Sequence, residues 1–149
     1  MAASSRLRIG RYSELGHVYL LTTVIQGREP VFADWRLGRL VVAALRQAEE
    51  EGLAESLAWV VMPDHLHWLL ALRAGSLTTL LRHTKSRSAL AMNTRLGRSG
   101  RLWQKGFHDR AIRREEDLRA VARYVVSNPL RAGLVSRVGD YPLWDAMWV

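Results

Sequence analysis

The sequence contains no cysteine. This absence excludes disulfide bonds, thiol catalysis and thiolate metal sites, so any metal would have to bind histidine, carboxylate, amide or hydroxyl groups. Long apolar runs are missing too, because no stretch approaches the roughly 20 residues that span a bilayer. The N-terminal segment MAASSRLRIGRYSELG also lacks the apolar core of a signal peptide. We therefore expect a soluble cytoplasmic protein.

Acidic residues are scarce between Arg82 and Arg114, where ten basic residues accompany one acid, Asp109. This segment carries a net charge of +9 by that count and the rest of the chain −1, so the whole excess of +8 comes from one stretch. Such a concentration favours a surface that binds a polyanion. Of the 22 basic residues 20 are arginine, which suits bidentate contacts with phosphate groups. An arginine-rich proteome together with solubility would explain the same charge without a ligand.

The length of 149 residues and a hydrophobic content of 48% predict one domain, 1–149, with an ordinary core. No internal repeat, low-complexity tract or linker interrupts it. We expect residues 1–15 to form a flexible N-terminal segment. The aromatic residues of the C-terminal tail, 139–149, are expected to pack back on the domain.

Hydrophobic periodicity predicts the order of the elements. Strands are expected at 17–25, 56–62, 65–72 and within 107–113, with Pro63-Asp64 as the turn of a hairpin. Helices are expected at 33–52 with Asp34 as N-cap, at 76–97 with Ser76 as cap and Gly97 at its end, and at 115–129 with Pro129 as its end. This βαββαβ order followed by a third helix predicts an α+β, ferredoxin-like antiparallel sheet.

Two histidines, His65 and His67, lie inside the run WVVMPDHLHWLLAL, in which ten of fourteen residues are apolar. Side chains alternate along a strand, so both imidazoles would point to one face, with Cα atoms about 7 Å apart. Such a pair can bind one metal ion. Hydrogen bonding at a sheet edge would explain the same two residues without a metal.

Tyr124 is the candidate nucleophile of the third predicted helix. With Leu118 at zero and about 100° per residue, Tyr124 falls near −120°, at the flank of the apolar stripe. Asn128 falls at roughly −80°, so its amide oxygen could serve as a third metal ligand, unless Pro129 has already turned it out of the helix. A packing tyrosine with a solvated hydroxyl is the alternative for Tyr124.

A metal-binding histidine pair, a helical tyrosine and a basic segment together suggest phosphodiester transesterification. The metal would polarise a phosphate oxygen while the phenolic oxygen attacks in line. A tyrosine ester conserves the energy of the cut bond, so the free 3′-hydroxyl can reverse the step. The pattern therefore favours strand transfer over hydrolysis.

The blocks MPDHLHWLL, LWQKGFHDRAIRREEDLRAVARYVVSNPLRAGLV and GDYPLWDA resemble the REP-associated tyrosine transposases, relatives of the single-tyrosine HUH transposases. The similarity runs from about Gly16 to the C-terminus. It implies an HUH endonuclease fold, Mg²⁺ or Mn²⁺ dependence and a covalent 5′-phosphotyrosine intermediate on single-stranded DNA. His65 and His67 match the metal-binding pair, Tyr124 the nucleophile and, less firmly, Asn128 the polar residue that completes the metal site. Family members are associated with palindromic repeats, so hairpin DNA is the implied ligand.

Within this reading the basic segment contacts DNA. Arg82, Lys85, Arg87, Arg98, Arg101 and Lys105 would follow the backbone. Trp103 would either stack on an unpaired base or plug the loop as a core residue. His108 and Arg110 alternate onto one face and would border the site, although His108 could equally be a structural histidine. For His17 we expect a core or edge position.

Two other functions fit the same residues. One is a ferredoxin-like nucleic-acid-binding module without catalysis, which would not require Tyr124. The other is a histidine-based metal hydrolase of small phosphoesters, with water as the nucleophile. A homodimer could share its active sites between chains, and nothing in the sequence decides the oligomeric state.

Overall fold

The structure, a computed structural model, describes residues 17–147, so the N-terminal segment 1–15 lies outside it. The predicted βαββαβ order is confirmed by β1 (Val18–Val24), α3 (Trp35–Glu50), β2 (Ala54–Met62), β3 (His65–Leu72), α4 (Leu77–Leu96) and β4 (His108–Ala111). It continues with α5 (Glu115–Val126), α6 (Asn128–Arg131) and β5 (Trp144–Ala146). Single 3-10 turns lie at η1 (Gln26–Arg28), η2 (Val31–Ala33) and η3 (Val138–Asp140).

The ends of the first two long helices follow local sequence signals. The side chain of Asp34 accepts a hydrogen bond from the backbone N–H of Arg36 at 3.0 Å, and that of Ser76 accepts one from Thr79 at 3.1 Å. Both satisfy N–H groups that a helix start leaves without a partner. Gly97 ends α4 with φ of 66°, a left-handed conformation that glycine adopts without steric cost.

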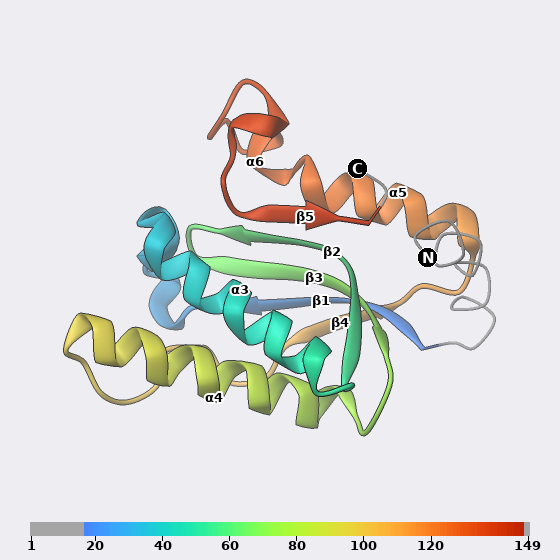
Figure 1. Cartoon of the computed structure of the whole chain (residues 1–149). Coiled ribbons are helices and arrows are strands. Elements are labelled where there is room, and N and C mark those ends of the chain that lie inside the picture. Colours follow the sequence, from blue (N-terminus) through green and yellow to red (C-terminus); the bar gives the residue numbers. More distant parts are fainter. Residues whose placement is uncertain (1–16, 148–149) are drawn as a thin grey trace.

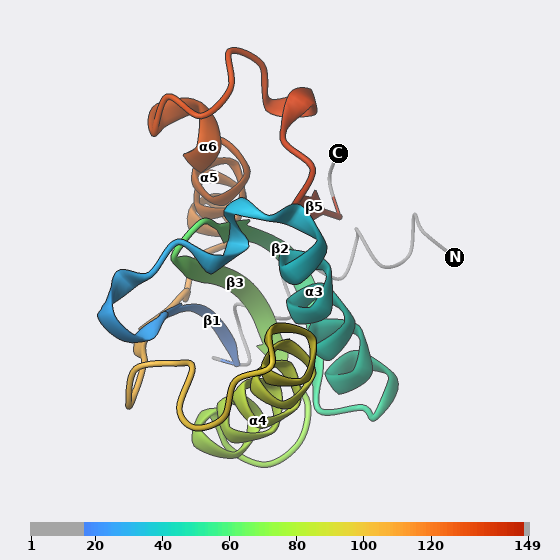
Figure 2. The same ribbon diagram turned by 90° about the vertical axis from the view of Figure 1, so that its left-hand side faces the viewer.

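The five strands form one antiparallel sheet in the order β4-β1-β3-β2-β5, with β3 in the centre. Figure 1 shows α3 and α4 together on one side of this sheet and α5 on the other. Figure 2, an end-on view, shows the same three layers. The sheet therefore has two buried faces.

The two faces have separate cores. Leu66, Trp68 and Leu70 of β3 pack with residues of α3 and α4. Leu69 and Ala71, on the alternate face, pack with Leu118, Val121, Ala122, Val125 and Val126 of α5. Side chains that share the parity of Leu69 and Ala71, including His65 and His67, therefore point toward the layer of α5.

The third helix ends earlier than expected. We predicted a continuous helix to Pro129, but α5 stops at Val126 and Asn128 begins the short helix α6. Proline disfavours helical geometry in the residue before it, and its own missing N–H is tolerated in a first helical turn. The break therefore falls before Pro129, and Tyr124 and Asn128 lie on different helices.

The C-terminal segment adds a strand that the sequence did not indicate. Trp144 of β5 pairs with Val60 of β2. The hydroxyl of Tyr141 donates a hydrogen bond to the carbonyl of Val61 at 2.6 Å, and burial raises the pKa of Tyr141 to about 12. Among residues 17–147 no helix is long and apolar enough to cross a membrane.

Candidate active site

His65 and His67 lie on the central strand, β3, and face the layer of α5 with Leu69 and Ala71. Their ring centroids are 4.8 Å apart, with an angle of 82° between the ring planes. Strands β1 and β2 pair with β3 on either side along the whole of this segment. The two imidazoles therefore stand on a strand that is hydrogen-bonded to neighbours on both edges.

Each histidine has a hydrogen-bond partner for its Nδ1 atom. Nδ1 of His65 lies 2.7 Å from Oδ1 of Asp64, and Nδ1 of His67 lies 2.8 Å from Oγ1 of Thr22. Burial would raise the pKa of Asp64, but hydrogen bonds and charges of His65 and Arg28 outweigh it and lower that pKa. An ionised carboxylate only accepts, so the Nδ1–H of His65 donates, and in the neutral form of this imidazole Nε2 carries the lone pair.

Thr22 allows the same tautomer at His67. Burial, followed by the charges of His65 and Arg131, lowers the pKa of His67 to about 4. His67 is therefore a neutral imidazole near pH 7, the form that binds metals. Partners at Nδ1 that leave Nε2 for a metal are typical of metal-binding histidines.

Tyr124 reaches this pair from α5. Its ring centroid lies 6.3 Å from that of His67, and 50% of its surface is exposed. Beside it is a pocket of about 320 Å³ lined by Leu20, Arg110, Asp117, Ala120, Val121 and Tyr124. The structure thus brings together three of the predicted residues, His65, His67 and Tyr124, although they come from elements about 60 residues apart in the sequence.

Asn128, the predicted third ligand, is half-buried at the start of α6. Its backbone carbonyl accepts a hydrogen bond from the N–H of Ala132 at 2.9 Å. Among the described residues no group of three His, Cys, Asp or Glu side chains could hold a metal. An ion bound by the two histidines would therefore need an amide, a hydroxyl, water or substrate oxygen as further ligands, a donor set that fits a catalytic site with open positions.

Arg131 is a site residue that the sequence analysis missed. Its Cζ atom lies 4.0 Å from the centroid of the Tyr124 ring, and its charge contributes to the lowered pKa of His67. One signal could have found it: Arg131 follows Tyr124 by seven residues, about two helical turns, which places both on one side of a helix. The break before Pro129 obscured that relationship.

The predicted DNA-contacting residues of β4 lie beside the site. His108 is opposite Thr22, and Arg110 is opposite Leu20. Directly paired residues share a face of the sheet, so His108, Thr22 and His67 form one row that faces α5. Lys105 and His108 also line a pocket of about 210 Å³ with Thr22.

The residues predicted on α4 belong to the opposite layer. Arg87 pairs with Glu51 at 2.7 Å, and Arg98, just after the helix, forms two hydrogen bonds of 2.8 Å with Glu29. Nζ of Lys85 donates to the carbonyl of Gln104 at 2.9 Å and to that of Gly106, and burial together with the charge of Arg101 lowers its pKa. Arg82 and Arg101 are exposed. The +9 segment is therefore divided between two faces, and some of its cations hold the 98–106 loop.

The structure excludes base stacking as the role of Trp103. The side chain is 3% exposed, lies 5.6 Å from Phe32 between ring centroids, and donates from Nε1 to Oγ of Ser88 at 2.9 Å. A buried ring cannot stack on a base. Trp103 is a core residue that anchors the loop, and its backbone pairs with Ile25 just after β1. His17, which we expected in the core or at an edge, is exposed just before β1 and is not a core residue.

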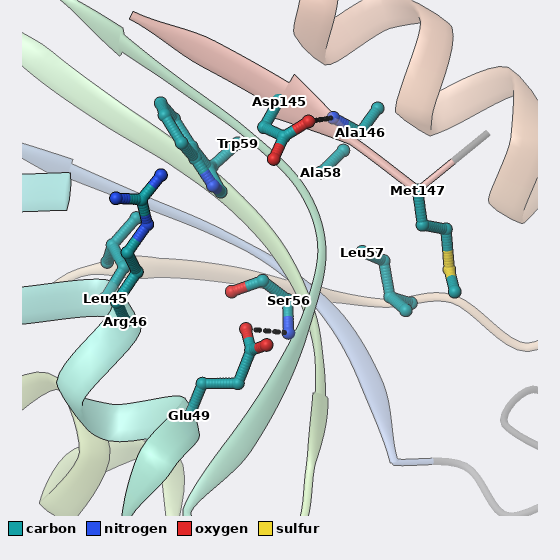
Figure 3. A pocket seen from close by; sticks show the side chains of 10 residues that line it. All are labelled: Leu45, Arg46, Glu49, Ser56, Leu57, Ala58, Trp59, Asp145, Ala146 and Met147. Carbon is teal, nitrogen blue, oxygen red and sulfur yellow. Dashed lines mark hydrogen bonds between the residues drawn. The ribbon is translucent and has the colours of Figure 1, made fainter. Parts of the chain in front are cut away.

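A third pocket, of about 170 Å³, lies at the far edge of the sheet between α3, β2 and β5 (Figure 3). Its carboxylates serve the backbone, because Glu49 accepts from the N–H of Ser56 at 3.1 Å and Asp145 from that of Ala146 at 2.8 Å. None of its lining residues belongs to the His65, His67 and Tyr124 group. The chemistry-bearing residues gather on the α5 side instead.

The chain is similar in sequence and in fold to known transposases. The sequence profile of the family described as "Transposase IS200 like" matches residues 15–128. The chain is 27% identical over 134 residues to the REP-associated tyrosine transposase of Escherichia coli K12, with 89% of this chain and 78% of that protein covered. A candidate REP-associated tyrosine transposase of Haemophilus influenzae is 28% identical over 138 residues, covering 85% and 78%. A solved structure of a REP-associated tyrosine transposase bound to a REP hairpin is similar with a TM-score of 0.70 and 26% identity, covering 87% of this chain and 76% of that chain.

Proposed function

The chain belongs to the IS200-like transposase family, and on that premise we propose that it nicks and rejoins single-stranded DNA through a covalent 5′-phosphotyrosine intermediate on Tyr124. The observation that carries this proposal is the distance of 6.3 Å between the ring centroids of Tyr124 and His67. A nucleic-acid-binding surface needs no half-exposed phenol next to a buried neutral imidazole and a second histidine. A phosphoryl-transfer site needs a nucleophile close to a metal-binding pair.

In the proposed step the phenolic oxygen of Tyr124 forms a bond to phosphorus as the bond from phosphorus to the 3′-oxygen breaks. The phenolic proton passes to solvent, and the departing 3′-oxygen takes up a proton. The product holds the 5′ end of the downstream strand as a phosphotyrosine ester. Attack by a 3′-hydroxyl on that ester reverses the step and joins two strands without another energy source.

His65 and His67 would hold the divalent ion, Mg²⁺ or Mn²⁺, through Nε2, with the amide oxygen of Asn128 as a further ligand. Such an ion, when bound, polarises a phosphate oxygen and offsets the negative charge that builds on phosphorus. Asp64 and Thr22 would fix the ring orientations through the two Nδ1 atoms. Asp64 and Thr22 would therefore favour the metal-binding tautomers of the two histidines before DNA binds.

The proposed substrate is a hairpin-forming single strand, since one similar protein has been solved with a REP hairpin. Arg110 and His108 lie on the face of the sheet that carries Tyr124, Lys105 lines a pocket with His108, and all three would contact phosphates next to the cut. The apolar side chains of Leu20, Ala120 and Val121 form part of the lining of the pocket beside Tyr124. An apolar lining of this kind can pack against an unstacked base.

The test is a cleavage reaction with a hairpin DNA labelled at its 3′ end and, separately, at its 5′ end, in the presence of Mn²⁺. The proposal predicts that the 3′ label stays with the protein on a denaturing gel, while the 5′-labelled fragment is released with a free 3′-hydroxyl. Tyr124→Phe should abolish the adduct. Tyr19→Phe, a half-buried tyrosine on the other face of the sheet, is the matched control and should react normally.

Two other outcomes would each reject the proposal. Tight hairpin binding with no adduct under any metal would identify a binding module without catalysis. Release of both labelled fragments by Tyr124→Phe at the wild-type rate would identify water as the nucleophile, as in a metal hydrolase.

A further inference from the structure

Arg131 is bound at two points to the last turn of α5. Nη2 donates to the backbone carbonyl of Tyr124 at 2.7 Å, and Nη1 donates to the hydroxyl of Ser127. The hydroxyl of Ser127 in turn donates to the same carbonyl at 3.3 Å. The last carbonyls of a helix have no partner within the helix and carry its negative end, so a cation is well placed there.

The same side chain covers one face of the Tyr124 ring. Its Cζ atom lies 4.0 Å from the ring centroid, well within the range of a cation–π contact. Tyr124 is half exposed, so burial alone does not hold the ring in one orientation. Arg131, anchored to the main chain of the tyrosine it covers, supplies the restraint that the core does not.

Arg131 also lies within electrostatic reach of the metal-binding pair. The Tyr124 ring that Arg131 covers at 4.0 Å lies 6.3 Å from the His67 ring between centroids. The guanidinium is therefore near both the proposed nucleophile and the histidine pair. The turn that joins α5 to α6 brings this charge back beside Tyr124.

We propose that Arg131 is the positioning residue of Tyr124: it holds the phenol ring beside the histidine pair and keeps a positive charge against the ring on which negative charge develops. This inference rests on the proposed function. As the phenolic oxygen bonds to phosphorus it gives up its proton, and in the rejoining step it departs with the electron pair of that bond. A fixed cation next to the ring favours both directions.

The chemistry of the contact favours arginine over lysine at this position. A guanidinium can stack on a ring and donate two hydrogen bonds in its own plane at the same time. An ammonium group keeps the charge but lacks the planar fork. Arg131→Lys should therefore retain part of the rate of adduct formation, and Arg131→Gln should lose most of it.

The experiment measures the rate of adduct formation in a single turnover at saturating hairpin DNA for wild type, Arg131→Gln and Arg131→Lys. Arg123→Gln is the matched control, because Arg123 is an exposed arginine on α5, the helix that carries Tyr124. We expect Arg131→Gln to slow adduct formation by about 100-fold, the effect of a misplacement of about 1 Å at a reacting group. Arg131→Lys should be intermediate, while the Kd for DNA and the Kd for Mn²⁺ stay within about threefold of wild type for all variants, since binding and chemistry separate in this way.

A second readout does not depend on cleavage. In protein with ¹³C-labelled tyrosine rings, the Tyr124 resonance is assigned by its loss in Tyr124→Phe, and Arg131→Gln should shift it while Arg123→Gln should not. A wild-type rate for Arg131→Gln at saturating DNA, or a loss that appears only as weaker DNA binding, would overturn the proposal. An unshifted Tyr124 resonance would do the same. If wild type forms no adduct with any hairpin, the proposed function fails, and the resonance alone decides whether Arg131 positions the ring. Should Arg131→Gln not fold, Arg131→Lys is the variant on which these outcomes are judged.

Discussion

The hydroxyl of Thr22 lies 2.8 Å from Nδ1 of His67, directly across the pairing of β1 with β3. This contact links an otherwise ordinary strand residue to the candidate metal site. It holds one of the two imidazoles in place through a neighbouring strand, so the geometry of the pair depends on strand register as well as on the H-x-H spacing. One substitution on β1 therefore tests the site without touching a histidine.

Thr22→Val removes the hydroxyl and keeps the shape of the side chain. We expect the affinity for Mn²⁺ to fall by about 10-fold to 100-fold, the usual effect of losing an outer partner of a metal-binding histidine. Titration calorimetry measures the affinity. Cleavage should recover as the Mn²⁺ concentration rises, because the nucleophile is untouched.

Thr23→Val is the control for that substitution. Thr23 is the next residue, is 3% exposed, and its Oγ1 has no hydrogen-bond partner among the described residues. Removing an unsatisfied buried hydroxyl should raise the free energy of unfolding by about 1 kcal/mol, and Mn²⁺ affinity should not change. Equal loss of metal affinity in both variants would rule out a dedicated role for Thr22.

The histidine pair should matter for cleavage far more than for DNA affinity. In the double variant His65→Ala/His67→Ala we expect no detectable adduct, because the metal that activates the phosphate is lost. Hairpin affinity should change by less than about threefold, since phosphate contacts elsewhere dominate binding. Fluorescence anisotropy at fixed salt measures the affinity, and parallel loss of binding and cleavage would contradict a metal role.

Arg110 and Arg82 are a matched pair on opposite faces of the sheet. Arg110 lines the pocket beside Tyr124, whereas Arg82 lies on α4. Arg110→Gln should weaken hairpin binding and reduce the slope of log K against log salt by about one, as expected for one lost phosphate contact. Arg82→Gln should leave both unchanged. The reverse ranking would place the DNA on the α4 side.

Trp103 should affect stability and not DNA binding. Trp103→Phe keeps most of the buried ring but loses the hydrogen bond to Ser88, so we expect the free energy of unfolding to fall by about 1–2 kcal/mol. Urea denaturation measures this loss. Hairpin affinity should stay the same, whereas a base-stacking tryptophan would cost about 1–3 kcal/mol of binding when removed.

The features predicted correctly are those encoded by neighbouring residues. Alternation along residues 65–72 was sufficient to place His65 and His67 on one face, and Ser76 and Gly97 mark the two ends of α4 as expected. Helical periodicity put Tyr124 at the flank of the apolar stripe of its helix. Each of these inferences depends on the geometry of a single element, which is repeated along the chain and can be read from spacing alone.

Other features depend on contacts between distant segments, and the sequence did not reveal them. Whether Trp103 meets a base or a core is decided by Phe32 and Ser88, which pack against it from elsewhere in the chain. The pairing of β5 with β2 and the contact of Arg131 with Tyr124 arise only when the chain has turned back on itself.

The sequence by itself therefore determined the βαββαβ order and placed His65, His67 and Tyr124 on their elements, because periodicity and capping act over a few residues. Only the tertiary structure decided which face of the sheet meets α5, which of the basic residues lie beside Tyr124, and that Arg131 covers its ring. Those outcomes follow from the burial of two apolar faces on opposite sides of one sheet, a property of the folded chain as a whole.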